Sequence, residues 1–168
     1  MMARMKLIGI ILMIGILLST CNVSSIAKIS KPYIFVDDDN TMGPWDGTLE
    51  HPYRTIIDGV NNASDGDTVF VFNGLYSNEY IYVRKSIKLV GEDKYNTIID
   101  GPYSAIEVED TINNQVLDGF EISNFMMKKL YAIYLYDCSH CTIYDNNIIG
   151  DNYNTRGIFL TNCSNCTV

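Results

Sequence analysis

From Thr68 onward the chain is built of short runs in which apolar and polar positions alternate. Turns rich in Asn, Asp, Gly and Ser separate these runs. Alternation with a period of two predicts β-strands that bury one face. No sustained period of 3.6 residues follows residue 66, which argues against a helical repeat. Upstream, a short helix is predicted over 52–63, because four apolar residues have the spacing of one helix face: Ile56, Ile57, Val60 and Ala63.

The strand runs form a repeat. Residues 132–143 align without a gap with residues 157–168, at an offset of 25. Residues 105–108 align with 132–135 at an offset of 27, and 86–89 precede 105–108 by 19. The alignment predicts one stacked column from the aliphatic pairs Ile87/Leu89, Ile106/Val108, Ile133/Leu135 and Ile158/Leu160. We therefore predict an all-β fold, a right-handed parallel β-helix of about four coils with a short N-terminal capping helix.

The N-terminus has the features of an export signal. Arg4 and Lys6 precede the apolar run Leu7–Leu18, which is too short to cross a bilayer core, and Ser25 to Ala27 supply small residues for cleavage. A lipid anchor at Cys21 and a buried N-terminal helix are the alternatives. The predicted organisation is a signal peptide (1–27), an N-terminal cap segment (28–66) and the β-helix coils (67–168). We expect a secreted or cell-surface protein with no transmembrane span in the mature chain.

Several stretches resemble NosD-like repeats of the pectin-lyase-like superfamily. They are residues 117–124 and 162–168 in the coils, and 36–41, 52–56, 65–69 and 73–76 in the segment before them. The resemblance implies the β-helix fold but leaves function open, because polysaccharide lyases, glycosidases and non-catalytic surface proteins share this fold. It also suggests copper handling as one option. Because the sequence stops within a repeat, we expect it to be an N-terminal fragment, with further domains on a missing C-terminal part.

Four cysteines occupy equivalent turns of two successive repeats, as Cys138/Cys141 and Cys163/Cys166. Three states are open: free thiols, the disulfides Cys138–Cys163 and Cys141–Cys166, or a metal site with His140 as a further ligand. The spacing of the two pairs resembles that of zinc ribbons, but the repeat alone accounts for it.

Asp100, Asp118 and Asp145 share one position in the same repeat alignment. Stacked carboxylates would make a candidate catalytic set, because glycosidases need two carboxylates about 5–10 Å apart. The alternative is that each aspartate forms a turn by hydrogen-bonding its own backbone.

The outward positions of the predicted column form a candidate ligand-binding face. The residues are Tyr134, Tyr136, Phe159 and Glu107, with Lys88 expected to pair with Glu107 across coils. Aromatic rings on a rigid sheet can bind the apolar face of a sugar, or they can merely stabilise the sheet.

Calcium is a possible cofactor at the acidic residues Asp37, Asp38, Asp39 and Asp46 with Asn40. Pro44 stands where an EF-hand loop needs glycine, so only a different type of calcium site would fit. An acidic turn without metal is the alternative.

The charge balance argues against a nucleic-acid partner. The chain has 12 Lys and Arg against 20 Asp and Glu, a net charge of −8, whereas nucleic-acid binders need a cationic surface. The favoured hypothesis is a non-catalytic module that binds a polysaccharide or cell-surface glycan. The competing hypothesis is a polysaccharide-processing lyase or glycoside hydrolase.

Overall fold

The computed structural model describes residues 33–101, 104–109, 117–128, 131–150 and 156–168. These residues belong to one compact unit, 31–168. The predicted signal peptide (1–27) and Cys21 lie outside the described residues.

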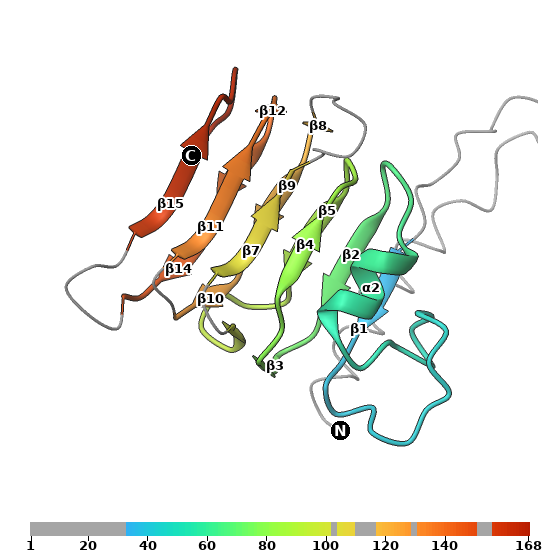
Figure 1. The fold of residues 1–168 in the computed structure, drawn as a ribbon. Helices are drawn as coiled ribbons and strands as arrows, with labels where there is room; N and C mark the ends of the chain where they lie inside the picture. The colour runs from blue at the N-terminus through green and yellow to red at the C-terminus, as the bar shows by residue number, and fades with distance from the viewer. Residues whose placement is uncertain (1–32, 102–103, 110–116, 129–130, 151–155) are drawn as a thin grey trace, which may run out of the picture. The chain divides into compact units, whose positions relative to one another are not determined.

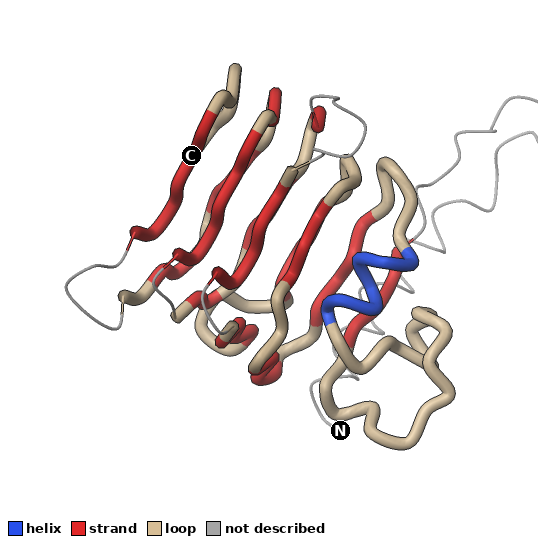
Figure 2. The backbone as a smooth tube through the Cα atoms, viewed as in Figure 1, coloured by secondary structure: helices blue, strands red, loops and turns tan. Residues whose placement is uncertain are grey.

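Parallel strands are the main regular structure of this unit, and a loop and one helix separate the first strand from the second (Figures 1 and 2). Sheet A contains β1 (Tyr33–Val36), β2 (Thr68–Val71), β5 (Lys88–Gly91), β9 (Glu121–Ser123) and β13 (Thr142–Tyr144). Sheet B contains β3 (Gly74–Ser77), β6 (Thr97–Asp100), β10 (Met126–Met127) and β14 (Asn147–Ile148). Sheet C contains β4 (Ile81–Val83), β7 (Ser104–Val108), β11 (Tyr131–Tyr136) and β15 (Arg156–Thr161). A short fourth pair joins β8 (Leu117–Asp118) to β12 (Cys138–Ser139).

The chain visits sheets A, B and C in turn and then repeats the circuit. β2, β3 and β4 are followed by β5, β6 and β7, then by β9, β10 and β11, and then by β13, β14 and β15. Each new strand pairs in parallel with the strand of the previous circuit. The predicted all-β, parallel β-helix fold is confirmed.

The inward positions of each sheet form aliphatic columns. In sheet C, Ile81, Ile106, Ile133 and Ile158 stand in register, and the first three have no exposed surface. In sheet A the equivalent column is Val69, Leu89, Ile122 and Ile143. Burying each such side chain stabilises the fold by about 1.5–3 kcal/mol, so these columns are the main source of stability along the axis.

The predicted helix is confirmed as α2 (Ile56–Asn62). Thr55 caps its N-terminus, because the Thr55 side chain accepts a hydrogen bond from the backbone N–H of Asp58. Ile56 and Val60 are buried, as the apolar spacing predicts. α2 contacts β1, β2 and β4, so it covers the first coil beside the edge strand of sheet C (Figure 1).

One stacking prediction is wrong. Ile87 and Leu89 do not belong to the sheet C column, because Leu89 lies in β5 of sheet A, between Val69 and Ile122. Ile81 takes the predicted place, 25 residues before Ile106. The error has a physical cause: all three sheets bury alternate residues, so alternation alone cannot say to which sheet a strand belongs.

Candidate functional site

The outer face of sheet C carries a row of ring-bearing and charged side chains in register. The row is Tyr82, Glu107, Tyr134 and Phe159, one residue from each of four successive strands. The rings of Tyr134 and Phe159 have centroids 5.3 Å apart and planes inclined by 6°, so the predicted ring stack is present. All four side chains are half-buried. We call these four residues the sheet C row.

Glu107 lies between two tyrosines of the sheet C row, because it pairs with Tyr82 on one side and Tyr134 on the other. Partial burial raises the pKa of its carboxyl. Tyr136, the other predicted binding residue, pairs with Thr161 and is half-buried.

Two arginines and a further tyrosine border the sheet C row, and the sequence reasoning missed them. The guanidinium of Arg84 lies 4.3 Å from the ring centroid of Tyr82, and that of Arg156 lies 5.6 Å from the ring of Phe159. Tyr80 stacks on Tyr82 with centroids 6.3 Å apart. The sequence signal for the two tyrosines was that aromatic and aliphatic residues alternate in 80–83, as they also do in 133–136.

The predicted pairing of Lys88 with Glu107 is wrong. Lys88 lies in sheet A and forms an ion pair with Glu121 on the neighbouring strand. Tyr82 occupies the place that the sequence alignment gave to Lys88.

The three aspartates of the predicted carboxylate column do not stack. Asp100 ends β6 in sheet B, in register with Ser77, whereas Asp118 lies in β8, in register with Ser139. Asp145 follows β13 of sheet A and forms an ion pair with Lys94. The column was wrong because the alignment matched turns that belong to different corners of the coil. The geometry of a glycosidase pair is therefore not found among these three residues.

Asp118 instead joins a small exposed hydrogen-bond cluster. Its Oδ1 accepts a hydrogen bond from Ser139 Oγ at 2.7 Å and lies 2.8 Å from His140 Nδ1. The bond from Ser139, together with that from His140, holds the pKa of Asp118 below its usual value. His140 therefore faces a carboxylate, and it is not grouped with the cysteines around a common metal position.

The four cysteines stack as the repeat predicts. The bridges Ser139–Ser164 and Thr142–Thr167 place Cys138 in register with Cys163 and Cys141 in register with Cys166. All four are free thiols, so the two predicted disulfides remain a prediction about an oxidised form. Cys138 and Cys141 are buried, and Cys163 and Cys166 are partly exposed.

The sulfurs of the two columns have different surroundings. Cys138 Sγ donates toward the carbonyls of Tyr136 and Val108, and Cys163 repeats this pattern one coil later. In the other column, the neighbouring Cys138 thiol lowers the pKa of Cys141. The same interaction, together with burial, raises the pKa of Cys138.

The carboxylates of the acidic segment proposed for calcium accept hydrogen bonds from backbone N–H groups and from a hydroxyl. Asp37 Oδ1 accepts from the N–H of Asp39, and Asp38 Oδ2 accepts from the N–H of Leu75. Asp46 Oδ1 accepts from the hydroxyl and the N–H of Thr48. Nowhere in the described residues do three or more His, Cys, Asp or Glu side chains converge on a possible metal position. Calcium binding at this segment stays a prediction.

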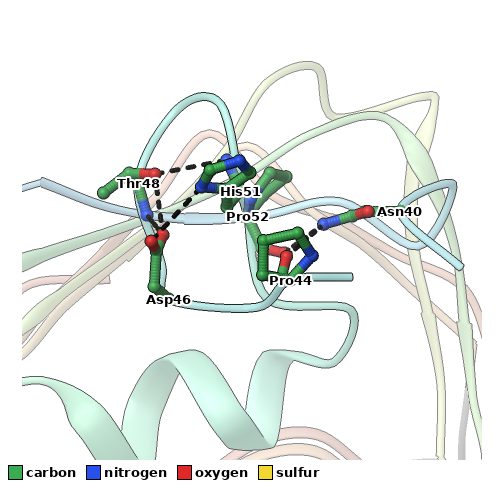
Figure 3. Close-up of polar contacts among 6 residues, drawn as sticks. All are labelled: Asn40, Pro44, Asp46, Thr48, His51 and Pro52. Carbon is green, nitrogen blue, oxygen red and sulfur yellow. Dashed lines mark hydrogen bonds and ion pairs between the residues drawn. The ribbon is translucent and has the colours of Figure 1, made fainter. Parts of the chain in front are cut away.

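Figure 3 shows the polar contacts that stabilise the loop of residues 40–52, which precedes helix α2. Asp46 Oδ2 lies 3.3 Å from Nδ1 of His51, and Asn40 Nδ2 donates to the carbonyls of Pro44 and Pro52. The hydrogen bonds from Thr48 lower the pKa of Asp46. These contacts close the loop on itself, which is a structural role.

Comparison with known families gives one match. Residues 60–168 match the family model described as "Periplasmic copper-binding protein (NosD)", which covers more than half of the chain. No curated protein and no solved structure matches the chain. No helix in the described part of the chain has the length and apolar character needed to cross a bilayer.

Proposed function

The chain belongs to the NosD family of β-helix proteins, and on that premise we propose that it is an exported, non-catalytic module that binds carbohydrate through the outer face of sheet C. The export signal read from residues 1–27 and the periplasmic description of the family support the location. The side chains of the sheet C row indicate the ligand class.

The stacked rings of Tyr134 and Phe159 carry the proposal. Flat rings bury the apolar face of a sugar, and the rigid strands beneath them hold the rings in place before a ligand arrives. Glu107 supplies hydrogen-bond acceptors beside the rings, and Arg84 supplies donors at the Tyr82 end. Sugar hydroxyls need both kinds of partner.

Single-stranded nucleic acids also stack on aromatic rows, so they are the obvious competitor for this face. They require a positively charged groove, however, and the chain has a net charge of −8. Glu107 lies at the centre of the row, where a phosphate backbone would meet a carboxylate. Carbohydrate is therefore the better fit.

Affinity electrophoresis in native gels that contain polygalacturonate, xylan or β-glucan tests the proposal. We expect one polymer to retard the wild-type chain, and Tyr134→Ala or Phe159→Ala to weaken that binding by about tenfold or more, about 1.4 kcal/mol. Tyr144→Ala is the control, because Tyr144 is an exposed tyrosine of sheet A. No retardation by any polymer, or equal retardation of all variants, would refute carbohydrate binding at this face.

Copper(I) binding is a second candidate, favoured by the stacked thiols. The family description names copper, and thiolates are the soft ligands that prefer Cu(I). The four free thiols of residues 138–166 are the only such donors among the described residues. The donor set fits copper in its reduced state and does not fit calcium.

A further inference from the structure

We infer that Cys141 and Cys166 form a two-coordinate Cu(I) site that joins one coil of the β-helix to the next. The inference rests on the copper candidate and goes beyond it, because it names the two ligands, the oxidation state and the coordination number. Four observations support it.

The first observation is the register of the two turns. Thr167 N–H donates to the carbonyl of Cys141 at 2.9 Å, and Ser164 N–H donates to that of Cys138 at 2.9 Å. The two CxxC turns are therefore paired like neighbouring strands, about 4.7–4.9 Å apart.

The second observation is that the paired side chains have the same orientation. Cys141 Sγ lies 3.5 Å from the carbonyl oxygen of Ser139, and Cys166 Sγ lies 3.5 Å from that of Ser164. With equal orientations, the two sulfurs are separated by about the strand spacing. A metal–thiolate bond is about 2.3 Å long, so a linear sulfur–metal–sulfur unit spans about 4.6 Å. A disulfide would instead require the turns to shift, because its Cβ atoms lie only about 3.5–4.5 Å apart.

The third observation concerns coordination number. Zinc in structural sites takes four ligands in a tetrahedron. Within the described segments, no three side chains of His, Cys, Asp or Glu are arranged to share a metal ion. Copper(I) is a soft ion that is stable with two thiolates in a line, so it needs only one stacked pair.

The fourth observation selects one of the two cysteine columns. The sulfurs of Cys138 and Cys163 each lie within hydrogen-bond distance of two carbonyl oxygens. Those of Cys141 and Cys166 each lie near one carbonyl oxygen. Loss of the thiol proton on metal binding therefore removes fewer hydrogen bonds at Cys141 and Cys166. Binding at the chosen pair releases one proton from each thiol and leaves a bis-thiolate complex with one negative charge.

Cu(I) competition with a colorimetric chelator, under anaerobic reducing conditions, tests the site. The protein is the full chain in a Cys21→Ser background, so the four stacked cysteines are its only thiols. We expect one Cu(I) per chain and two sulfur ligands by X-ray absorption. Cys141→Ser and Cys166→Ser should each weaken binding by about 100-fold or more, since even loss of an outer-shell contact costs about 10–100-fold. Cys163→Ser is the matched control and should bind as tightly as the parent.

A second measurement avoids substitution in the buried turn. Cu(I) should protect the partly exposed Cys166 of the otherwise unaltered chain from alkylation and leave Cys163 reactive, as mass spectrometry of the peptides would show. If the chain binds no Cu(I), both the copper candidate and this site are refuted. If it binds Cu(I) but Cys163→Ser weakens binding as much as Cys141→Ser, the two-ligand site alone is refuted.

Discussion

The carboxylate of Glu79 accepts a hydrogen bond from the backbone N–H of Ile57 at 3.0 Å, and so ties the residues before β4 to the first turn of α2. Glu79 is buried, and burial is the main reason that its pKa is raised to about 7. Asp58 and Asp38 raise it further. The first turn of α2 therefore donates a hydrogen bond to a carboxylate whose charged form is disfavoured in the folded protein.

The raised pKa of Glu79 predicts that this residue adds stability to the fold as pH falls from about 7 to about 4.5. A carboxyl whose pKa is raised on folding binds its proton more tightly in the folded state, so the gain is complete below its ordinary pKa and is lost as pH rises through 7. Glu79→Gln should stabilise the protein at pH 8 by about 1–3 kcal/mol and remove this pH dependence, as measured by urea unfolding. Glu92→Gln is the control, because Glu92 accepts the N–H of Asn73 at an exposed site. A variant at position 79 with the wild-type pH profile would contradict the argument.

Lys85 caps the C-terminal end of α2. Its Nζ donates to three carbonyls at the end of α2, those of Val60, Asn61 and Ala63. A cation at this end also interacts favourably with the helix dipole. Lys85→Met should cost about 1–2 kcal/mol of unfolding free energy. Lys94→Met, which removes a surface ion pair with Asp145 and a contact with the Tyr95 ring, should cost much less. Equal losses would show that Lys85 has no special role.

Gly91 should tolerate no side chain. A Cβ at this position would lie 2.2 Å from the carbonyl oxygen of Asn124, an atom of the turn in the neighbouring coil. Gly91→Ala should therefore lower stability by about 1–3 kcal/mol. Gly157→Ala is the comparison, because its Cβ would meet only the side chain of Ile148, at 3.4 Å. The prediction fails if thermal unfolding is the same for both variants.

The corrected register can be tested with charges. A double-mutant cycle on Lys88 and Glu121 should give a coupling energy of about 0.2–1 kcal/mol, which salt reduces. The same cycle on Lys88 and Glu107 should give none, since these residues lie in different sheets. Coupling of Lys88 to Glu107 would contradict the observed register and support the pairing predicted from the sequence.

The contrast between two stretches of the chain explains what could be predicted. Residues 132–143 and 157–168 align without a gap, so the ring stack of Tyr134 on Phe159 and the cysteine columns were both anticipated. Earlier coils have turns of unequal length, and their strands look alike because each sheet buries alternate residues. The alignment therefore put Lys88 where Tyr82 belongs and stacked three aspartates that lie apart.

Turn conformation is a further property that the sequence shows only indirectly. Asp137 and Asn162 both have a positive φ, and Asn162 donates to Asp137 across the coils. His140 and Asn165 repeat the pattern. Asn and Asp tolerate this backbone region better than other residues with a side chain. Their abundance in the turns is therefore a conformational requirement, and Asp145, one of the three aspartates aligned in the sequence, is among these positive-φ residues.

The offset of 25 residues that places Phe159 on Tyr134 also places Cys166 on Cys141. One structural period thus sets the spacing of both surfaces. Duplicating one 25-residue repeat would add a ring to the aromatic stack and a sulfur to the cysteine column in the same step. An engineer could lengthen the scaffold in this way, and neither surface could be extended without the other.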